Sequence, residues 1–391
     1  MQKKILLKEL VNIDSGFAFK SSLFTNDEQY IPIIRIRDIN SGETKTYYSG
    51  EYDEQYIVNN GDLLISMDGS FTVRKWNGGK ALLNQRVCRI KSISDQLTDD
   101  YLFRILPKKL KEIEDKTPFV TVKHLSVKGI QNIELNLPTL DIQNKVVKIL
   151  DKAQRLIDNK NNQLELLDEL VKSRFIEMFG NPFIDEKNFG IKKLSEVTMI
   201  NPKKMEVKEL DQTLNVSFVP MDKVGEKGQF NSELVKTIKD VYSGFTYFKE
   251  EDVLFAKITP CMENGKGAIA KDLKNGIGFG STEFHVIRPI KEKTNSYWIY
   301  HLTTLTEFRR LAERKMTGSA GQKRVPSNFF INIQVVVPPI ELQNQFSDFV
   351  TQVDKLKFTY KFNYTHKIYN IYSILCLKMY KIFNFNKKTY L

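Results

Sequence analysis

Two short polar segments combine the residue types that bind phosphates and read base edges. Residues 317–324 supply glycines, hydroxyls, an amide and two adjacent cations, and residues 117–124 supply hydroxyls, a lysine and a histidine. Hydroxyls and main-chain amides suit phosphate oxygens, whereas Lys, Arg and Gln match guanine and adenine edges in a major groove. We therefore treat both segments as candidate contacts to double-stranded DNA. Their candidate residues are Thr117, Lys123, His124, Thr317, Ser319, Gln322, Lys323 and Arg324.

Further basic residues form a second candidate group in each half of the chain. For any single lysine, a solvated surface position is the simpler interpretation. Equivalent clusters in two halves favour a shared DNA-binding role for the set, although not for each member. The first half contributes Arg35, Arg37, Arg74, Lys75, Lys80, Gln85 and Arg86, and the second contributes Lys203, Lys204, Lys257, Lys266 and Lys271.

Catalytic chemistry finds little support in the sequence. The histidines and cysteines lack the spacing of metal ligands, and residues 265–270 lack the third glycine of a dinucleotide-binding motif. Residues 181–183 resemble a fragment of the adenine-methyltransferase motif, but a helix end explains them. We predict no catalytic site, no metal site and no cofactor in this chain. The residues considered are His124, His285, His301, His366, Cys88, Cys261 and Cys376.

Composition indicates an ordinary soluble globular protein. The chain has 391 residues, 41% hydrophobic and 27% charged, which is enough for two or three domains. No stretch approaches the roughly 18 to 20 apolar residues of a membrane span. Three scattered cysteines fit a reducing cytoplasm. The net charge of +12 favours a polyanionic partner, but residues 358–391 hold six lysines and no acid, which is half of that excess.

An internal repeat organises the chain. Residues 132–144 align without gaps on residues 332–344, and Lys123 falls on Lys323. Weaker similarity at shifted offsets relates residues 61–65 to residues 251–255. The same order of matches along the chain predicts globule, long helix, globule, long helix.

Each globule is predicted to be rich in strands, because short β-branched or apolar runs lie between turn residues. Short helical patterns follow these runs, at 99–110 in the first globule and at 296–315 in the second. A last strand, at 135–137 and at 335–337, leads into each long helix. The expected strands cover 30–39, 62–67 and 86–90, then 216–224, 252–258 and 284–287.

The central helix is expected to span residues 141–180. Apolar residues seven apart give a coiled-coil seam, and Pro138 and Gly180 mark the two ends. At about 1.5 Å per residue such a helix is roughly 55 Å long, more than one globular domain needs. We predict domains at 1–140 and 181–340, with helices at 141–180 and from 341, the distal match ending at 357. The seam residues are Leu150, Ile157, Leu164, Leu167, Val171 and Met178, with Phe346, Val350 and Val353 on the distal helix.

These motifs resemble the DNA-specificity subunit of type I restriction–modification systems. The resemblance is carried by Leu-Pro-Thr-Leu-Asp-Ile-Gln at 137–143 and Val-Pro-Pro-Ile-Glu-Leu-Gln at 337–343. Residues 175–182 and 281–289 add to it, and it covers roughly residues 5–357. The implied fold is α/β (α+β): two strand-rich target-recognition domains, each followed by a long helix, with the helices pairing as an antiparallel coiled coil.

The resemblance also implies a non-catalytic reader of a bipartite DNA site. Two adenine-methyltransferase subunits would dock on the helices, and restriction and translocase subunits would complete a cytoplasmic complex. S-adenosylmethionine, ATP and Mg would then bind to those partner subunits. A fused nuclease or methyltransferase is the rival enzyme interpretation, and a coiled-coil scaffold that binds proteins is a third.

The C-terminal segment departs from the family pattern. Residues 358–391 are rich in Tyr, Lys, Asn, Ile and Phe and lack acids, which favours a shifted reading frame through AT-rich DNA. Resequencing the 3′ end of the gene tests this hypothesis. A rough helical spacing remains at Tyr364, Ile368, Ile371, Leu375 and Ile382. An inactive allele, or a donor for exchange of recognition domains, is therefore an alternative function.

Overall fold

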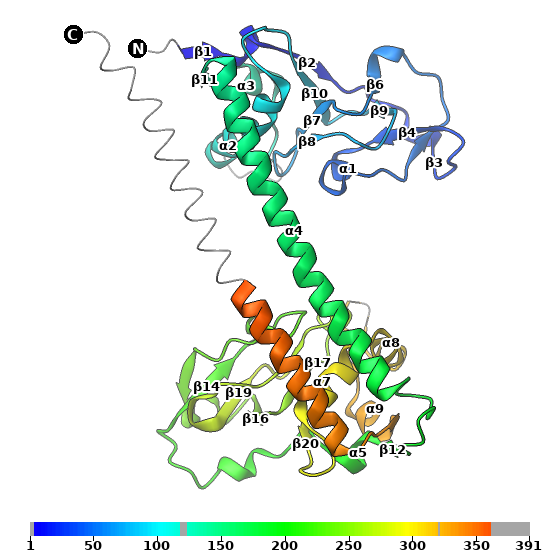
Figure 1. Cartoon of the computed structure of the whole chain (residues 1–391), viewed down its shortest axis with the longest axis vertical. Helices are drawn as coiled ribbons and strands as arrows, with labels where there is room; N and C mark the ends of the chain where they lie inside the picture. Colours follow the sequence, from blue (N-terminus) through cyan, green and yellow to red (C-terminus); the bar gives the residue numbers. More distant parts are fainter. Residues whose placement is uncertain (1–3, 118–122, 320, 361–391) are drawn as a thin grey trace, which may run out of the picture. The chain divides into compact units, whose positions relative to one another are not determined.

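A computed structural model describes residues 4–117, 123–319 and 321–360 (Figure 1). The chain forms two compact units, Met1–Asn159 and Lys160–Leu391. The helical spacing predicted between Tyr364 and Ile382 lies outside the described residues.

The described residues of the first unit form three sheets. Alternating apolar residues form a four-stranded antiparallel sheet of order β2-β10-β7-β8, and a five-stranded sheet of order β3-β5-β4-β9-β6 contains one parallel pair, β4 with β9. The four-stranded sheet consists of β2 (Val11–Ser15), β10 (Val87–Ser92), β7 (Leu63–Ser66) and β8 (Val73–Lys75). The others contain β3 (Phe24–Thr25), β5 (Tyr47–Tyr48), β4 (Ile31–Ile34), β9 (Ala81–Leu83), β6 (Ile57–Val58), and the pair β1 (Lys4–Leu6) and β11 (Glu134–Asn136).

Helices pack on the four-stranded sheet of the first unit. They are α1 (Ile36–Ser41), α2 (Asp99–Lys116) and α3 (Val127–Gln131), with short 3-10 turns at Leu7–Glu9, Ser21–Leu23 and Glu54–Tyr56. Helices α2 and α3 share one core with the sheet, and α1 packs in a second cluster with Leu64 and Val87. Leu102, Leu106 and Leu110 of α2 are buried in the shared core, beside Ile65 and Ile90 of the strands.

The second unit repeats this plan. Its four-stranded antiparallel sheet has the order β13-β20-β17-β18, and its other large sheet, β15-β14-β19-β16, again contains one parallel pair, β14 with β19. The strands are β13 (Thr198–Ile200), β20 (Phe284–Pro289), β17 (Val253–Ala256), β18 (Gly267–Ile269), β15 (Val235–Thr237), β14 (Asn215–Val219), β19 (Ile277–Gly280), β16 (Thr246–Lys249), and the pair β12 (Ile191–Lys193) and β21 (Gln334–Val336).

Short helices again flank these sheets, and Trp298, Leu302 and Phe308 are buried in the main core of the second unit. The helices are α5 (Leu194–Val197), α6 (Ile238–Val241), α7 (Ser296–Thr304), α8 (Thr306–Arg314) and α9 (Ser327–Asn332). The 3-10 turns are η4 (Lys204–Val207), η5 (Met221–Lys223) and η6 (Lys274–Gly276).

One continuous helix, α4 (Leu140–Phe179), contributes to both units. It ends where Gly180 adopts a left-handed conformation with φ of 74°, which favours glycine. In the first unit Val147 of α4 is buried in the core. In the second unit α4 lies beside a helix of residues 340–360, drawn in orange in Figure 1.

Helix α4 and the 340–360 helix begin with the same arrangement of hydrogen bonds. Gln143 is fully buried; its Oε1 accepts from the N–H of Thr98, and its Nε2 donates to the carbonyls of Gln96 and Pro138. Gln343 is equally buried and bonds in the same manner to Asn295, Lys293 and Pro338. Because Thr98 and Asn295 are the N-caps of α2 and α7, each glutamine joins the starts of two helices.

Several predicted elements end earlier than expected. The strand predicted at 30–39 stops at Ile34, because Asp38 accepts from the N–H of Arg35 at 2.8 Å and caps α1. The strand predicted at 216–224 stops at Val219, where Pro220 begins a 3-10 turn.

The helical stretches also differ from the predicted lengths. The helix predicted at 296–315 is two helices, because Leu305 has an extended backbone with ψ of 137°. The helix predicted at 99–110 runs on to Lys116 despite Pro107 within it.

Candidate nucleic-acid interface

In the first unit, two of the candidate segments, those that contain Arg86 and His124, meet where β7 ends. The carbonyl of Met67 accepts from the N–H of Leu125 at 2.7 Å, and the N–H of Met67 donates to the carbonyl of Arg86 at 2.9 Å. His124 Nδ1 lies 2.6 Å from Asp68 Oδ1, and Arg86 Nη1 lies 3.2 Å from the same carboxylate. Main-chain pairing therefore brings Arg86 and His124 together around one acid.

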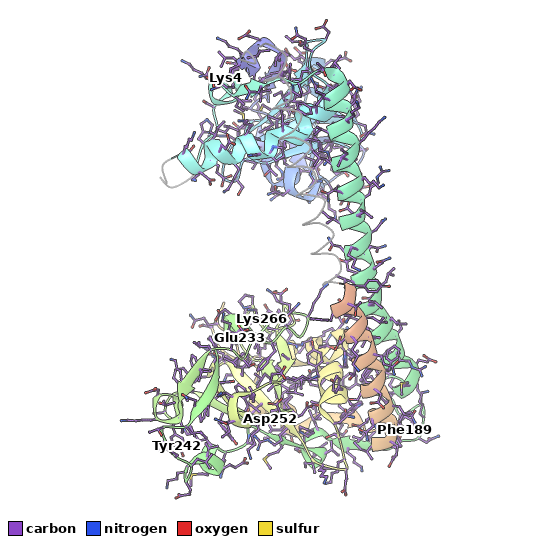
Figure 2. The ribbon with its side chains drawn as sticks, turned by 60° about the vertical axis from the view of Figure 1, so that its left-hand side comes forward. Lys4, Phe189, Glu233, Tyr242, Asp252 and Lys266 are labelled. Carbon is purple, nitrogen blue, oxygen red and sulfur yellow. The ribbon has the colours of Figure 1, made fainter. Side chains whose placement is uncertain are left out.

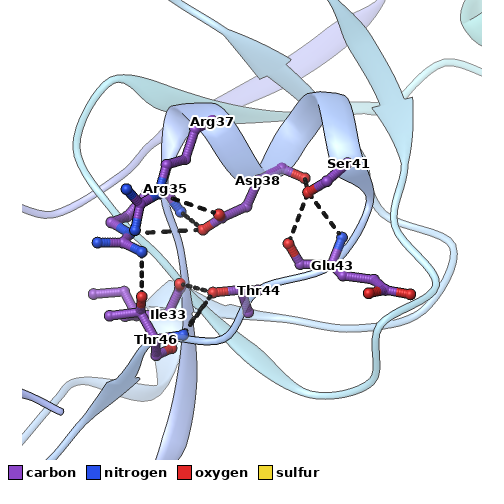
Figure 3. A network of polar contacts seen from close by, with 8 residues as sticks. All are labelled: Ile33, Arg35, Arg37, Asp38, Ser41, Glu43, Thr44 and Thr46. Atoms are coloured by element: carbon purple, nitrogen blue, oxygen red, sulfur yellow. Dashed lines mark hydrogen bonds and ion pairs between the residues drawn. The ribbon is translucent and has the colours of Figure 1, made fainter. Parts of the chain in front are cut away.

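A second group in the first unit gathers at α1 (Figure 3). Arg35 donates to Thr46 and lies near Asp38, and Arg37 Nε lies 3.7 Å from Asp38. Arg74 donates to the carbonyls of Ile39 and Asn40 at the end of this helix. Arg35 and Arg74 thus already donate to acceptors within the protein, whereas Arg37 makes an ion pair of 3.7 Å. The Arg37 side chain is 69% exposed, against 25% for Arg35.

The other candidates of the first unit are more dispersed. Lys75 pairs with Asp100 at 2.9 Å, Lys123 donates to the carbonyl of Glu114, and Thr117 Oγ1 donates to the carbonyl of Ile113 at 2.8 Å. The remaining two, Lys80 and Gln85, have exposed side chains.

In the second unit, an equivalent meeting point lies at the end of β17. The carbonyl of Lys257 accepts from the N–H of Val325 at 2.9 Å, and the N–H of Lys257 donates to the carbonyl of Glu283 at 2.9 Å. The Arg324 guanidinium donates through Nε and Nη2 to Glu283 and through Nη1 to the carbonyl of Gln322. Lys257, Gln322 and Arg324 are therefore brought together.

The segment 317–324 is a tight turn beside this point. Thr317 and Arg324 exchange two main-chain hydrogen bonds of 3.0 and 2.8 Å, and the N–H of Gln322 donates to the carbonyl of Ser319 at 3.0 Å. The side chains of Thr317, Ser319, Gln322 and Lys323 are exposed. Among the residues that the structure describes, Lys323 forms no ion pair, so its charge is available to a phosphate.

The remaining lysines of the second unit fall in different places. Lys266 adjoins β17, because its carbonyl accepts from the N–H of Ala256 at 3.2 Å. Lys271 Nζ donates to the hydroxyl of Tyr297 at 2.5 Å. Lys204 instead donates to the carbonyl of Tyr242 at 2.6 Å, and the exposed Lys203 precedes it. Figure 2 shows Tyr242 and Lys266 far apart on this unit, so Lys203 and Lys204 do not join the cluster at β17.

The two meeting points are structurally equivalent, but their charges differ. The isolated bridge between Asp68 and His124 corresponds to the bridge between Ile258 and Arg324. Arg86 occupies the place that Glu283 has in the second unit. The carbonyl of Arg86 accepts from the N–H of Met67 after β7, and the carbonyl of Glu283 accepts from the N–H of Lys257 after β17. The carboxylates Asp38, Asp68 and Glu283 were missed in the sequence, because nothing in their spacing shows that they face the predicted cations.

The paired helices bring only part of the predicted seam together. Val171 and Met178 are buried, as are Phe346, Val350 and Val353 of the distal helix. The ring centroids of Phe175 and Phe346 lie 5.5 Å apart, and Lys357 Nζ lies 2.7 Å from Asp168, so the two helices are antiparallel within the second unit. Leu150, Ile157, Leu164 and Leu167 are half-buried, and the heptad pattern missed Phe175 and Phe179.

The described histidines and acids form no candidate metal centre. Within 4–117, 123–319 and 321–360, no group of three or more His, Cys, Asp or Glu could hold a metal ion. Burial lowers the pKa of His301 to about 3, and burial likewise lowers the pKa of His285. Both imidazoles are therefore neutral packing groups at physiological pH. No described helix has the length and apolar character to cross a membrane.

Lys323 and Arg324 give a matched pair for testing DNA contact. Replacing the exposed Lys323 by alanine is expected to weaken DNA binding equally across sequences and to reduce the salt dependence by about one counterion. Arg324→Ala is expected to change the salt dependence less, because Glu283 already offsets the charge of Arg324. Binding titrations at several salt concentrations measure both slopes. Equal slopes for Lys323→Ala and the parent protein would remove this turn from the DNA interface, as would unchanged affinity in the double variant.

Comparison with known families shows what this chain is similar to. The sequence model described as type I restriction modification DNA specificity domain matches residues 2–168 and residues 186–386. The specificity subunit of the type I restriction enzyme EcoBI from Escherichia coli is 41% identical over 169 residues, 43% of this chain and 36% of that protein. The specificity subunit of MjaVIII from Methanocaldococcus jannaschii is 23% identical over 325 residues, 78% of this chain and 75% of that protein.

The chain thus covers about a third of the length of the EcoBI subunit that it matches, 36%. Two solved structures share its fold. The type I restriction–modification S subunit from M. genitalium has a TM-score of 0.50 at 12% identity, covering 95% of this chain and 94% of that one. A chain from a study of complex assembly and conformational transition of the type I R-M system has a TM-score of 0.52 at 14% identity, covering 95% and 96%. The predicted mixed α/β fold with two strand-rich halves is confirmed.

Proposed function

The chain belongs to the type I restriction modification DNA specificity domain family, and from this premise we propose that it is the non-catalytic DNA-reading subunit of a type I restriction–modification complex. Its two strand-rich halves would each read one part of a bipartite sequence. The turns at the ends of β7 and β17 would face the DNA, with exposed cations on the phosphates and polar side chains on the base edges.

The observation that carries this proposal is the duplication of the sheet together with its polar turn. The orders β2-β10-β7-β8 and β13-β20-β17-β18 are equivalent, and in each sheet the same strand end is bridged to His124 or to Arg324. Two copies of one scaffold with different side chains suit two half-sites of different sequence. A single binding surface would not require the second copy.

We propose partners in two classes. Double-stranded DNA is the first, and two methyltransferase subunits, docking on α4 and the 340–360 helix, together with restriction and translocase subunits, form the second. S-adenosylmethionine, ATP and Mg would be bound by those partner subunits, and the complex would act in the cytoplasm. The exposed apolar residues of α4 support a docking role, because Leu166 and Leu170 remain 60% and 47% exposed.

Selection from random-sequence DNA tests the proposed function. The full chain, co-purified with its methyltransferase subunits, is expected to enrich duplexes that share two short defined segments separated by unspecified bases. Mapping of adenine methylation in the host genome is expected to return the same bipartite motif. Enrichment of no motif, or of one uninterrupted motif, would contradict a two-domain reader. Salt concentration is held constant throughout, because DNA affinity depends steeply on it.

A further inference from the structure

The connection between β17 and β18 is the place where the two repeats differ most clearly around the candidate interface. Ten residues, 257–266, join these strands, whereas six residues, 67–72, join β7 and β8. Both connections begin at the meeting points described above. The longer one therefore adds four residues next to the turn that contains Lys323.

This longer loop is folded tightly on itself. Its main-chain N–H groups at Met262, Asn264 and Lys266 donate to the carbonyls of Ile258, Pro260 and Cys261, at 2.9, 2.9 and 3.0 Å. The Met262 side chain is fully buried beneath it. Internal bonds and a buried anchor of this kind restrict the main-chain conformation of a loop.

A buried arginine from α8 holds the loop from below. Arg309 is 9% exposed, and it donates to the carbonyls of Met262 and Gly265 at 3.0 and 3.2 Å. Its Nε donates to the carbonyl of Thr303 at 2.7 Å, and its guanidinium lies 4.1 Å from the centre of the Phe255 ring. One rigid fork thus joins the loop to the end of α7.

Burial of the charged Arg309 side chain is unfavourable as a way of packing this core. Among the described residues Arg309 forms no ion pair with an acid, and burial lowers the pKa of Arg309 to about 10, which still leaves it charged at neutral pH. A buried charge that is compensated only by carbonyls and a ring costs free energy relative to an apolar side chain. The hydrogen bonds from Arg309 hold the carbonyls of Met262 and Gly265 in place, and they thereby restrict the main chain that carries the two side chains between them.

The side chains between these carbonyls can read bases. Glu263 and Asn264 are exposed, and they lie between the two carbonyls that Arg309 holds. An amide can pair with adenine, and a carboxylate can accept from cytosine. The loop is also joined to the basic turn, because the N–H of Thr259 donates to the carbonyl of Lys323 at 3.0 Å. Base-reading groups and a phosphate-binding cation therefore share one rigid surface.

The first unit anchors its shorter loop with the opposite charge. Glu114 of α2 accepts from the N–H of Phe71 at 3.2 Å, and its carbonyl accepts from Lys123. A hydrogen bond from Lys111 lowers the pKa of Glu114, so the anchor is anionic at neutral pH. The two loops differ in length and in anchor, as expected if each reads its own sequence.

We propose that residues 257–266 form the base-reading loop of the second recognition domain, with Glu263 and Asn264 as specificity-determining residues and Arg309 as a positioning residue. This inference rests on the proposed DNA-reading function and assigns one half-site to one loop. It makes the second half-site dependent on Arg309 and the first half-site independent of it.

The test compares the two half-sites selected by one protein. The chain with both Glu263→Gln and Asn264→Ala, in complex with its methyltransferase subunits, is subjected to random-site selection beside the parent complex. About a tenfold loss of preference is expected at one or more base positions of one half-site, since a good bidentate contact discriminates by that order. The other half-site serves as an internal control and should stay unchanged. Glu209→Gln, an exposed acid of the same unit that follows η4, is the matched control and should leave both half-sites unchanged.

Arg309 is tested by two substitutions that differ in hydrogen bonding. Arg309→Met keeps an unbranched side chain but loses all three bonds, and it should relax base preference in the same half-site that the loop variant changes. Arg309→Lys keeps the charge without the planar fork and should have an intermediate effect. If Arg309→Met unfolds the second unit, the exposed loop variant decides alone. Unchanged preferences in the loop variant, with a bipartite motif in the parent, overturn the loop assignment. Absence of any motif in the parent overturns the proposed function instead.

Discussion

Replacing Phe346 by alanine is expected to lower the free energy of unfolding of the second unit by about 3 to 5 kcal/mol. Phe346 is fully buried where the 340–360 helix meets α4 and α7. Its ring centroid lies 5.5 Å from that of Phe175 and 5.3 Å from that of Phe179. The His301 ring lies 5.1 Å away on the third side. Alanine would leave a cavity between the 340–360 helix, α4 and α7, and small shifts of these helices would not fill it.

Hydrogen exchange combined with denaturant unfolding of the full chain measures this loss. Amides of the 340–360 helix should exchange faster in Phe346→Ala, while those of the first unit should not change. Leu356→Ala is the matched control, because Leu356 lies on the same helix and is 50% exposed. It should cost less than about 1 kcal/mol. A Phe346→Ala protein as stable as this control would show that the ring cluster does not hold the helix.

The repeat was predictable because its strongest match falls on residues that perform the same structural task twice. Residues 132–144 and 332–344 each contain a strand, a proline and a buried glutamine at a helix start. Such a task restricts side-chain type, so the two copies remain alike in sequence. The pairs β1–β11 and β12–β21 then form with equivalent register. The domain limits at 140, 180 and 340 remain predictions.

Element ends were less predictable where a tertiary contact decides them. Residues 296–315 have continuous helical periodicity, yet the backbone breaks at Leu305. The break places the carbonyl of Thr303 within reach of Arg309. Periodicity cannot show this, because the other two carbonyls bound by Arg309 come from a loop more than forty residues earlier, near Met262.

Residue type predicted the candidate site, but it did not predict which of its cations form ion pairs with acids of the protein. The basic turn at 317–324 was identified from its glycines, hydroxyls and cations, and Lys323 is exposed there. Arg324, chosen for the same reason, is engaged by Glu283, an acid 41 residues earlier in the chain. Long-range partners of this kind decide which cation is available to DNA. Contact between any of these residues and DNA remains a prediction.

Substitution of either buried glutamine, Gln143 or Gln343, should strongly lower the free energy of unfolding of the unit in which it lies and leave the other unit unchanged. Gln143→Ala is expected to destabilise the first unit, and Gln343→Ala the second, each by about 2 to 4 kcal/mol. Each substitution removes three hydrogen bonds and leaves one N–H and two carbonyls without these partners. Differential scanning calorimetry of the full chain, with hydrogen exchange to assign each transition to a unit, measures the effect.

Glutamate at the same positions separates hydrogen bonding from packing. Gln343→Glu keeps the shape of the side chain, but its carboxylate would face the carbonyls of Lys293 and Pro338, which now receive donated hydrogen bonds. Its cost should therefore equal or exceed that of alanine, because the buried carboxylate keeps the Asn295 N–H as a donor to one oxygen while its other oxygen faces two carbonyls. Gln163→Ala, at an exposed position of α4, should stay within about 0.5 kcal/mol of the parent protein. If Gln343→Glu were as stable as the parent protein, the glutamine would act only by filling space, and the shared helix start would not depend on its hydrogen bonds.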